Sequence, residues 1–69
     1  MYSVCFNNPG TAEKFRIIDE DGKFFVEVKS GNNPYMSFGY PRKFYSFSDA
    51  YDVLKAARPA ILLEKKGVN

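Results

Sequence analysis

Hydrophobic and polar positions alternate along residues 14–29, KFRIIDEDGKFFVEVK, and this alternation predicts a β-hairpin. The dipeptide Asp21-Gly22 fits a two-residue turn, because both central positions of such a turn need a positive φ angle. This turn fixes a register in which Ile17 faces Val26. One side of the hairpin is then apolar and consists of Phe15, Ile17, Phe24, Val26 and Val28.

The opposite side of the hairpin is mostly charged, and on it Arg16 faces Glu27. It also carries one apolar cross-strand pair, Ile18 with Phe25. This pair either lies beneath another element or is exposed.

Two further segments read as strands. Residues 2–6, YSVCF, alternate and end at the turn cluster of residues 7–10. Residues 35–40 alternate as well, and we expect them to form a third hairpin strand beside residues 24–29. Pro41 breaks or edges that strand because it offers no N–H group, and residues 43–45 then resume extended structure.

Residues 46–58 form the one expected helix, with Ser46 and Asp49 resembling a capping box and Pro59 ending it. Helical spacing gives this segment an apolar stripe of Phe47, Ala50, Tyr51, Leu54 and Ala57. Residues 60–66, AILLEKK, read as a final strand, although the same residue types are compatible with a helix.

The expected order is β-β-β-β-α-β, an α+β fold in which a small antiparallel sheet carries one helix on one face. Residues 1–69 make a single compact domain of a size that is marginally stable alone. We expect the helix to cover the apolar side of the hairpin, so that the other side faces solvent or a partner.

The composition argues against an enzyme. The chain has one cysteine, Cys5, and no histidine, so a zinc site or a nucleophile with a histidine base cannot be built. Asp19, Glu20 and Asp21 cluster at the hairpin turn, where Asp is favoured for backbone reasons. No nucleotide-binding glycine pattern is present. We therefore expect no catalytic residues, no metal and no cofactor.

The single cysteine, with no signal-peptide pattern at the N-terminus, indicates a reducing, cytoplasmic setting. No apolar run approaches the ~20 residues of a membrane span, so we expect no membrane partner. Charge is uneven along the chain. Residues 1–28 carry three basic and five acidic groups, net −2, whereas residues 29–69 carry seven and three, net +4. This asymmetry either creates a basic face or is scatter in a small chain.

The surplus of aromatic residues favours a small non-enzymatic module that binds another protein, since aromatic residues and arginine anchor interfaces. We expect the binding surface on residues 35–45 and the adjoining charged side of the hairpin. Its six candidate residues are Ile18, Phe25, Tyr35, Tyr40, Arg42 and Lys43. In the competing arrangement, residues 60–66 or a homodimer would cover Ile18 and Phe25.

The alternative function is nucleic-acid binding. Arg42 and Lys43 lie among Tyr40, Phe44 and Tyr45, and basic groups interleaved with aromatic rings can hold phosphates and stack bases. Over residues 14–58, three strands followed by a helix resemble the integrase arm-type and plant AP2-type DNA-binding domains. That resemblance implies a sheet face that reads DNA, although the expected reading strands here carry Ile18 and Glu27 instead of a row of Arg and Lys.

In size, and in the absence of a recognisable active site, the chain also resembles the short proteins that phages encode to block a host enzyme or defence complex, anti-CRISPR proteins among them. This resemblance of type implies an inhibitor that acts by binding another protein.

Overall fold

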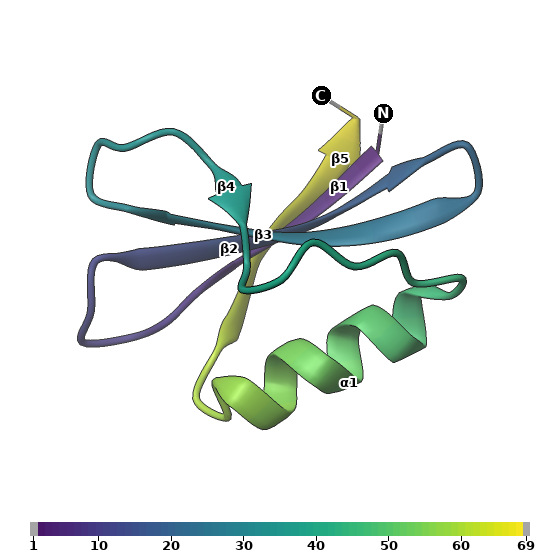
Figure 1. Cartoon of the computed structure of the whole chain (residues 1–69). Helices are drawn as coiled ribbons and strands as arrows, with labels where there is room; N and C mark the ends of the chain where they lie inside the picture. Colours follow the sequence, from purple (N-terminus) through teal and green to yellow (C-terminus); the bar gives the residue numbers. More distant parts are fainter. Residues whose placement is uncertain (1, 69) are drawn as a thin grey trace.

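The computed structural model describes residues 2–68, which form one antiparallel sheet and one helix (Figure 1). In chain order the elements are β1 (Tyr2–Asn7), β2 (Glu13–Glu20), β3 (Lys23–Ser30), β4 (Met36–Ser37), α1 (Phe47–Ala57) and β5 (Leu62–Val68). The strands lie in the order β4-β3-β2-β1-β5, and each neighbouring pair is antiparallel. The predicted α+β fold, with one helix on one face of a small antiparallel sheet, is confirmed.

The β2–β3 hairpin has the predicted register, with Ile17 opposite Val26 and Arg16 opposite Glu27. Its turn has φ angles of 52° at Asp21 and 76° at Gly22, the left-handed values that a two-residue turn between twisted strands requires. The alternation and the turn chemistry therefore specify the same pairing.

The core lies between α1 and the side of the sheet that was predicted to be covered. It contains Phe15, Leu54 and Ala50 without measurable exposure. Ser46 caps the helix, since its Oγ accepts a hydrogen bond of 3.1 Å from the backbone N–H of Asp49. The predicted apolar stripe is wrong at both ends, because Phe47 and Ala57 are exposed.

The final strand predicted over residues 60–66 is confirmed as β5, which begins two residues later and lies beside β1 at one edge of the sheet. Its register against β1 shifts after Lys65 pairs with Cys5, so that Leu63 pairs with Phe6 and Glu64 forms a β-bulge. No helix of the described residues is long and apolar enough to cross a membrane.

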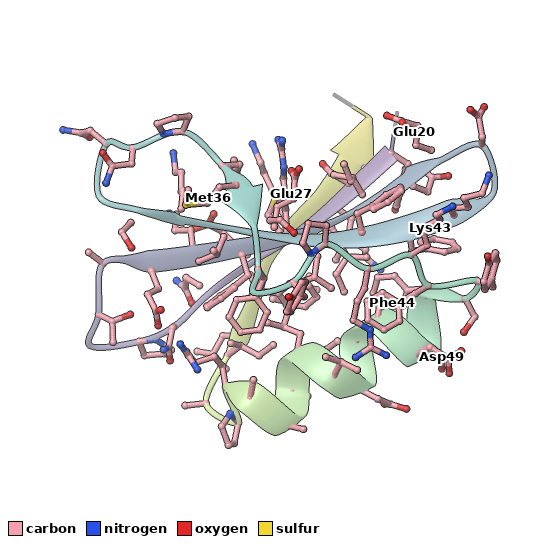
Figure 2. The ribbon with its side chains drawn as sticks, in the orientation of Figure 1. Glu20, Glu27, Met36, Lys43, Phe44 and Asp49 are labelled. Atoms are coloured by element: carbon pink, nitrogen blue, oxygen red, sulfur yellow. The ribbon has the colours of Figure 1, made fainter. Side chains whose placement is uncertain are left out.

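β4 lies beside β3 as predicted, but it is two residues long where residues 35–40 were expected. After Phe38 the chain turns at Gly39, whose φ of 71° ends the extended path. Phe44 then makes a single bridge to Phe24, and its buried ring lies between the sheet and α1, opposite the side that holds Glu27 (Figure 2). Residues 40–45 are thereby drawn to the helix side of the sheet.

The sheet side opposite α1, here called the open face, is less open than expected. Ile18 has 7% exposure, and the neighbouring Ser3 and Cys5 are also buried. Ile18 is therefore buried, although it was named among the six candidate residues for partner binding. Ile18 belongs to a central strand, so Ser3 on β1 and Phe25 on β3 flank it, and Phe25 itself is half-buried.

Candidate functional site

The six residues predicted to bind a partner do not form one surface. Ile18, Phe25 and Tyr35 belong to the open face, with Tyr35 beside the Arg16 guanidinium at 4.1 Å. The other three, Tyr40, Arg42 and Lys43, are exposed in the loop on the helix side. The turn at Gly39 and the burial of Phe44 separate the two groups.

A groove on the helix side is lined mainly by apolar side chains. The α1 backbone approaches β2 and β3 and stays farther from β1 and β5, although Val4 and Phe6 on β1 are buried in the shared core. The resulting depression of about 370 Å³ is here called the β1–α1 groove. It is lined by Val4, Phe6, Phe47, Tyr51, Leu63 and Lys66.

Two aromatic rings one helical turn apart form one wall of the β1–α1 groove. The rings of Phe47 and Tyr51 stack with centroids 6.0 Å apart and an interplanar angle of 12°. Tyr51 also reaches Phe6 on β1, with centroids 5.7 Å apart. Leu63 on β5 is 56% exposed and Phe47 is 37% exposed, so apolar surface faces solvent from both the helix and the sheet.

Lys66 is the cation at the β5 side of this groove. It forms no ion pair within the described residues, so its ammonium group is available to a carboxylate from outside. An apolar depression with a cation beside it fits an apolar side chain that is followed by an acidic one.

A second depression, of about 270 Å³, lies on the open face and is here called the basic pocket. Its lining consists of Cys5, Lys14, Arg16, Lys29, Tyr35, Glu64 and Lys65. Lys14 pairs with Glu64 at 2.6 Å, and this hydrogen bond is the main reason that the pKa of Glu64 is lowered. Burial raises the pKa of the Tyr35 hydroxyl.

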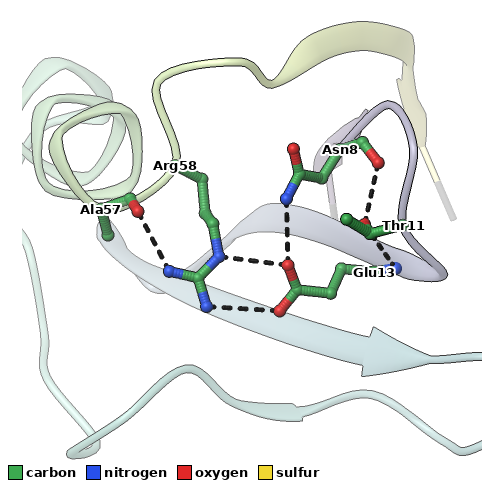
Figure 3. Close-up of polar contacts among 5 residues, drawn as sticks. All are labelled: Asn8, Thr11, Glu13, Ala57 and Arg58. Atoms are coloured by element: carbon green, nitrogen blue, oxygen red, sulfur yellow. Dashed lines mark hydrogen bonds and ion pairs between the residues drawn. The ribbon is translucent and has the colours of Figure 1, made fainter.

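Arg58 and Glu13 form a polar cluster that holds the end of α1 to the start of β2 (Figure 3). Asn8 donates a third hydrogen bond to Glu13, from Nδ2 to Oε1 at 3.0 Å. The hydrogen bond from Arg58 and then that from Asn8 lower the pKa of Glu13. Because its donors and acceptors are already satisfied by one another, this cluster is structural.

The loop that contains Tyr40, Arg42 and Lys43 lies beside both aromatic rings and carboxylates. The Arg42 guanidinium lies 4.7 Å from the centroid of the Phe44 ring, and Tyr40 is 89% exposed. A shallow depression beside Arg42 and Lys43 also contains the carboxylates of Asp49 and Asp52. Acidic groups of the protein therefore accompany these two cations.

Within residues 2–68, no group of three or more His, Cys, Asp or Glu side chains is placed to hold a metal ion. Cys5 is buried in β1 as a free thiol. No family model matches the chain, and no curated protein or solved structure is detectably similar to it.

Sequence reasoning did not assign the groove residues Phe47, Tyr51 and Leu63 to a binding surface. Phe47 and Tyr51 were assigned to the helix stripe that faces the core, and the pattern cannot tell which half of a sheet a short helix covers. Two tertiary anchors decide this. The Phe24–Phe44 bridge holds the start of α1 near β3, and the pair of Arg58 and Glu13 holds its end at β2.

Proposed function

We propose that this chain is a non-enzymatic protein-binding domain, and that its β1–α1 groove holds an amphipathic helix of another protein. The observation that carries this proposal is that the α1 backbone approaches β2 and β3 but not β1 or β5, so that Phe47 and Tyr51 on α1 and Leu63 on β5 border an open depression. Leu63 on β5 and Phe47 on α1 keep 56% and 37% exposure, which is apolar surface on two sides of one depression.

A helix fits the form of this surface. Phe47 and Tyr51 are four positions apart and present a ridge along α1, and helices pack by placing such ridges into the grooves of a neighbour about 8–10 Å away. A partner helix beside α1 would contact this ridge and cover Leu63 at the same time. It would complete a layer of two helices on the sheet, a common two-layer arrangement.

An added strand fits less well. β5 is the long edge strand of the sheet, but it carries the bulge at Glu64 and the lysines Lys65 and Lys66. Bulges and lysines are the devices by which edge strands resist pairing with another chain. They disfavour both strand addition by a partner and edge-to-edge pairing of two copies.

The groove also defines the chemistry of the partner helix. Its buried stripe should consist of aliphatic or aromatic residues at spacings of three and four, the pattern of helices that bind in apolar grooves. An Asp or Glu beside that stripe would pair with Lys66, which has no partner carboxylate within the described residues. In the inhibitor role that we propose, the domain acts in the cytoplasm by occupying such a helix on its target.

The test is a titration of the whole protein with a model amphipathic peptide that has Leu at helical spacing and Glu beside the stripe. We expect saturable NMR shifts at Phe47, Tyr51 and Leu63. A peptide with Lys in place of each Glu should bind about tenfold more weakly, since it loses one charge-assisted contact to Lys66.

The chain offers a matched control on one strand. Leu63→Asp should abolish peptide binding, whereas Leu62→Asp should preserve it, because the two leucines are 56% and 59% exposed but point to opposite sides of β5. Equal loss in both variants would contradict the proposal. Sedimentation that shows a dimer of the wild type and a monomer of Leu63→Asp would instead assign the groove to a second copy of this chain.

A further inference from the structure

We infer that the basic pocket on the open face is a phosphate-binding site, separate from the β1–α1 groove on the other side of the sheet. Its lining has four basic side chains and one acidic side chain, net +3. The cations come from three strands, with Lys14 and Arg16 on β2, Lys29 on β3 and Lys65 on β5. The pairing of these strands brings them together from distant parts of the sequence.

Only part of this positive charge is balanced within the described residues. Lys14 is held by Glu64, and Arg16 uses its Nε to donate a hydrogen bond of 2.6 Å to Glu27. Among residues 2–68, no carboxylate lies within ion-pair distance of the ammonium groups of Lys29 and Lys65. The hydrogen bond from Lys14 is the main cause of the lowered pKa of Glu64, and the charges of Lys65 and Lys29 lower it further.

The geometry of the pocket favours phosphate over a carboxylate. A phosphate carries more negative charge and more acceptor oxygens than a carboxylate, which suits several converging donors. The Arg16 side chain is fixed between Glu27 and the Tyr35 ring, with its guanidinium carbon 4.1 Å from the ring centroid. A guanidinium held in this way is pre-organised for phosphate oxygens. The volume of about 270 Å³ admits a tetrahedral anion with water around it.

The test is an NMR titration of the whole protein with inorganic phosphate and with pyrophosphate, using acetate at equal ionic strength for comparison. We expect saturable shifts of the Tyr35 ring and of the amides of Arg16 and Lys29, with pyrophosphate binding tighter than phosphate. Equal saturation by acetate, or shifts that never saturate, would overturn the assignment to phosphate.

Two double variants of equal net charge distinguish binding in the pocket from attraction by the overall positive charge of the protein. Lys29→Gln with Lys65→Gln should weaken pyrophosphate binding by about tenfold or more, from the loss of two charge-assisted contacts. Lys23→Gln with Lys55→Gln, which removes two cations outside the pocket lining, should leave binding within about twofold, since distant surface charges are screened. Equal weakening in the two variants would show a diffuse charge effect and refute the site.

A single-stranded oligonucleotide identifies the source of the phosphate. If the phosphate belongs to a nucleic acid, the oligonucleotide binds tighter than pyrophosphate, loses affinity linearly in the logarithm of salt concentration, and responds to Lys29→Gln with Lys65→Gln. If the source is a small phosphate compound, pyrophosphate binds in the pocket, and the oligonucleotide binds the wild type no tighter than it binds Lys29→Gln with Lys65→Gln. The variant Leu63→Asp leaves either result unchanged.

Discussion

Arg58, which follows α1, donates two hydrogen bonds to Glu13 at the start of β2, from Nε to Oε1 at 3.1 Å and from Nη2 to Oε2 at 3.3 Å. The two residues are 45 positions apart, so this forked contact closes a long loop around the core. The guanidinium also lies 5.9 Å from the Phe15 ring and 5.5 Å from the Phe38 ring. The pair therefore joins the helix end, β2 and the loop after β4.

Replacing either partner of this pair should lower the free energy of unfolding, and Arg58→Ala should cost more than Glu13→Gln. The alanine removes the ring contacts as well as the forked hydrogen bonds, whereas the glutamine keeps an acceptor oxygen. Arg58→Lys should resemble the larger loss, because an ammonium group cannot form the fork. Urea unfolding of the single and double variants measures the coupling, and an additive double variant would show that the contact contributes nothing.

Acid should weaken the same contact. The Arg58 hydrogen bond holds the pKa of Glu13 below its ordinary value of 4.5 in the folded protein. A carboxylate with a lowered folded pKa stabilises the protein at pH values above its unfolded pKa, and this stability is lost as the pH falls through the folded pKa. The thermal unfolding midpoint should therefore decrease as the pH is lowered below the ordinary glutamate value of 4.5, and it should decrease less steeply in Glu13→Gln. Equal steepness in the two proteins would contradict this account.

The sequence predicts the parts of the fold that depend on neighbouring positions. The alternation and the Asp21-Gly22 turn specify the hairpin register, and Ser46 specifies the start of the helix. The placement of the helix over one half of the sheet depends on Phe44 and Arg58, whose partners are distant in the sequence. No local pattern reports such contacts.

The candidate site was predicted less completely for the same reason. Tyr35 does line the basic pocket, but Lys29 and Lys65 join it through pairing across four strands. The prediction that placed Tyr40 on the same surface extended the alternation of residues 35–40 past Gly39, where the backbone turns. Strand period alone cannot locate such a turn.

Leu54→Ala should destabilise the protein by about 2–5 kcal/mol, the range for a fully buried leucine whose cavity is only partly filled. Leu54 has no measurable exposure at the centre of the helix–sheet contact. Ala57→Lys is the control on the same helix, because Ala57 is exposed, and it should change stability by no more than about 0.5 kcal/mol. A thermal midpoint of Leu54→Ala equal to that of the wild type would show that α1 is not part of the core.

Within the loop of residues 40–45, the exposed residues should contribute little to stability and the buried Phe44 should contribute much. Tyr40→Ala with Arg42→Ala should change the free energy of unfolding by about 1 kcal/mol or less, because Tyr40 is 89% exposed and an exposed cation–π contact is worth about that much. Phe44→Ala should cost about 3–5 kcal/mol, since its ring is buried against the sheet. Denaturant unfolding of the two variants compares them directly.

The same double variant decides whether this loop belongs to a binding surface. The loop lies on the helix side, but its exposed rings and Arg42 are absent from the lining of both the β1–α1 groove and the basic pocket. Tyr40→Ala with Arg42→Ala should therefore leave binding of the amphipathic peptide and of pyrophosphate within about twofold, the scatter expected for surface changes away from an interface. If peptide binding weakens at unchanged stability, the partner extends past α1 onto this loop. In that case Tyr40 and Arg42 contact the partner, as the sequence predicts, and the β1–α1 groove is only part of the interface.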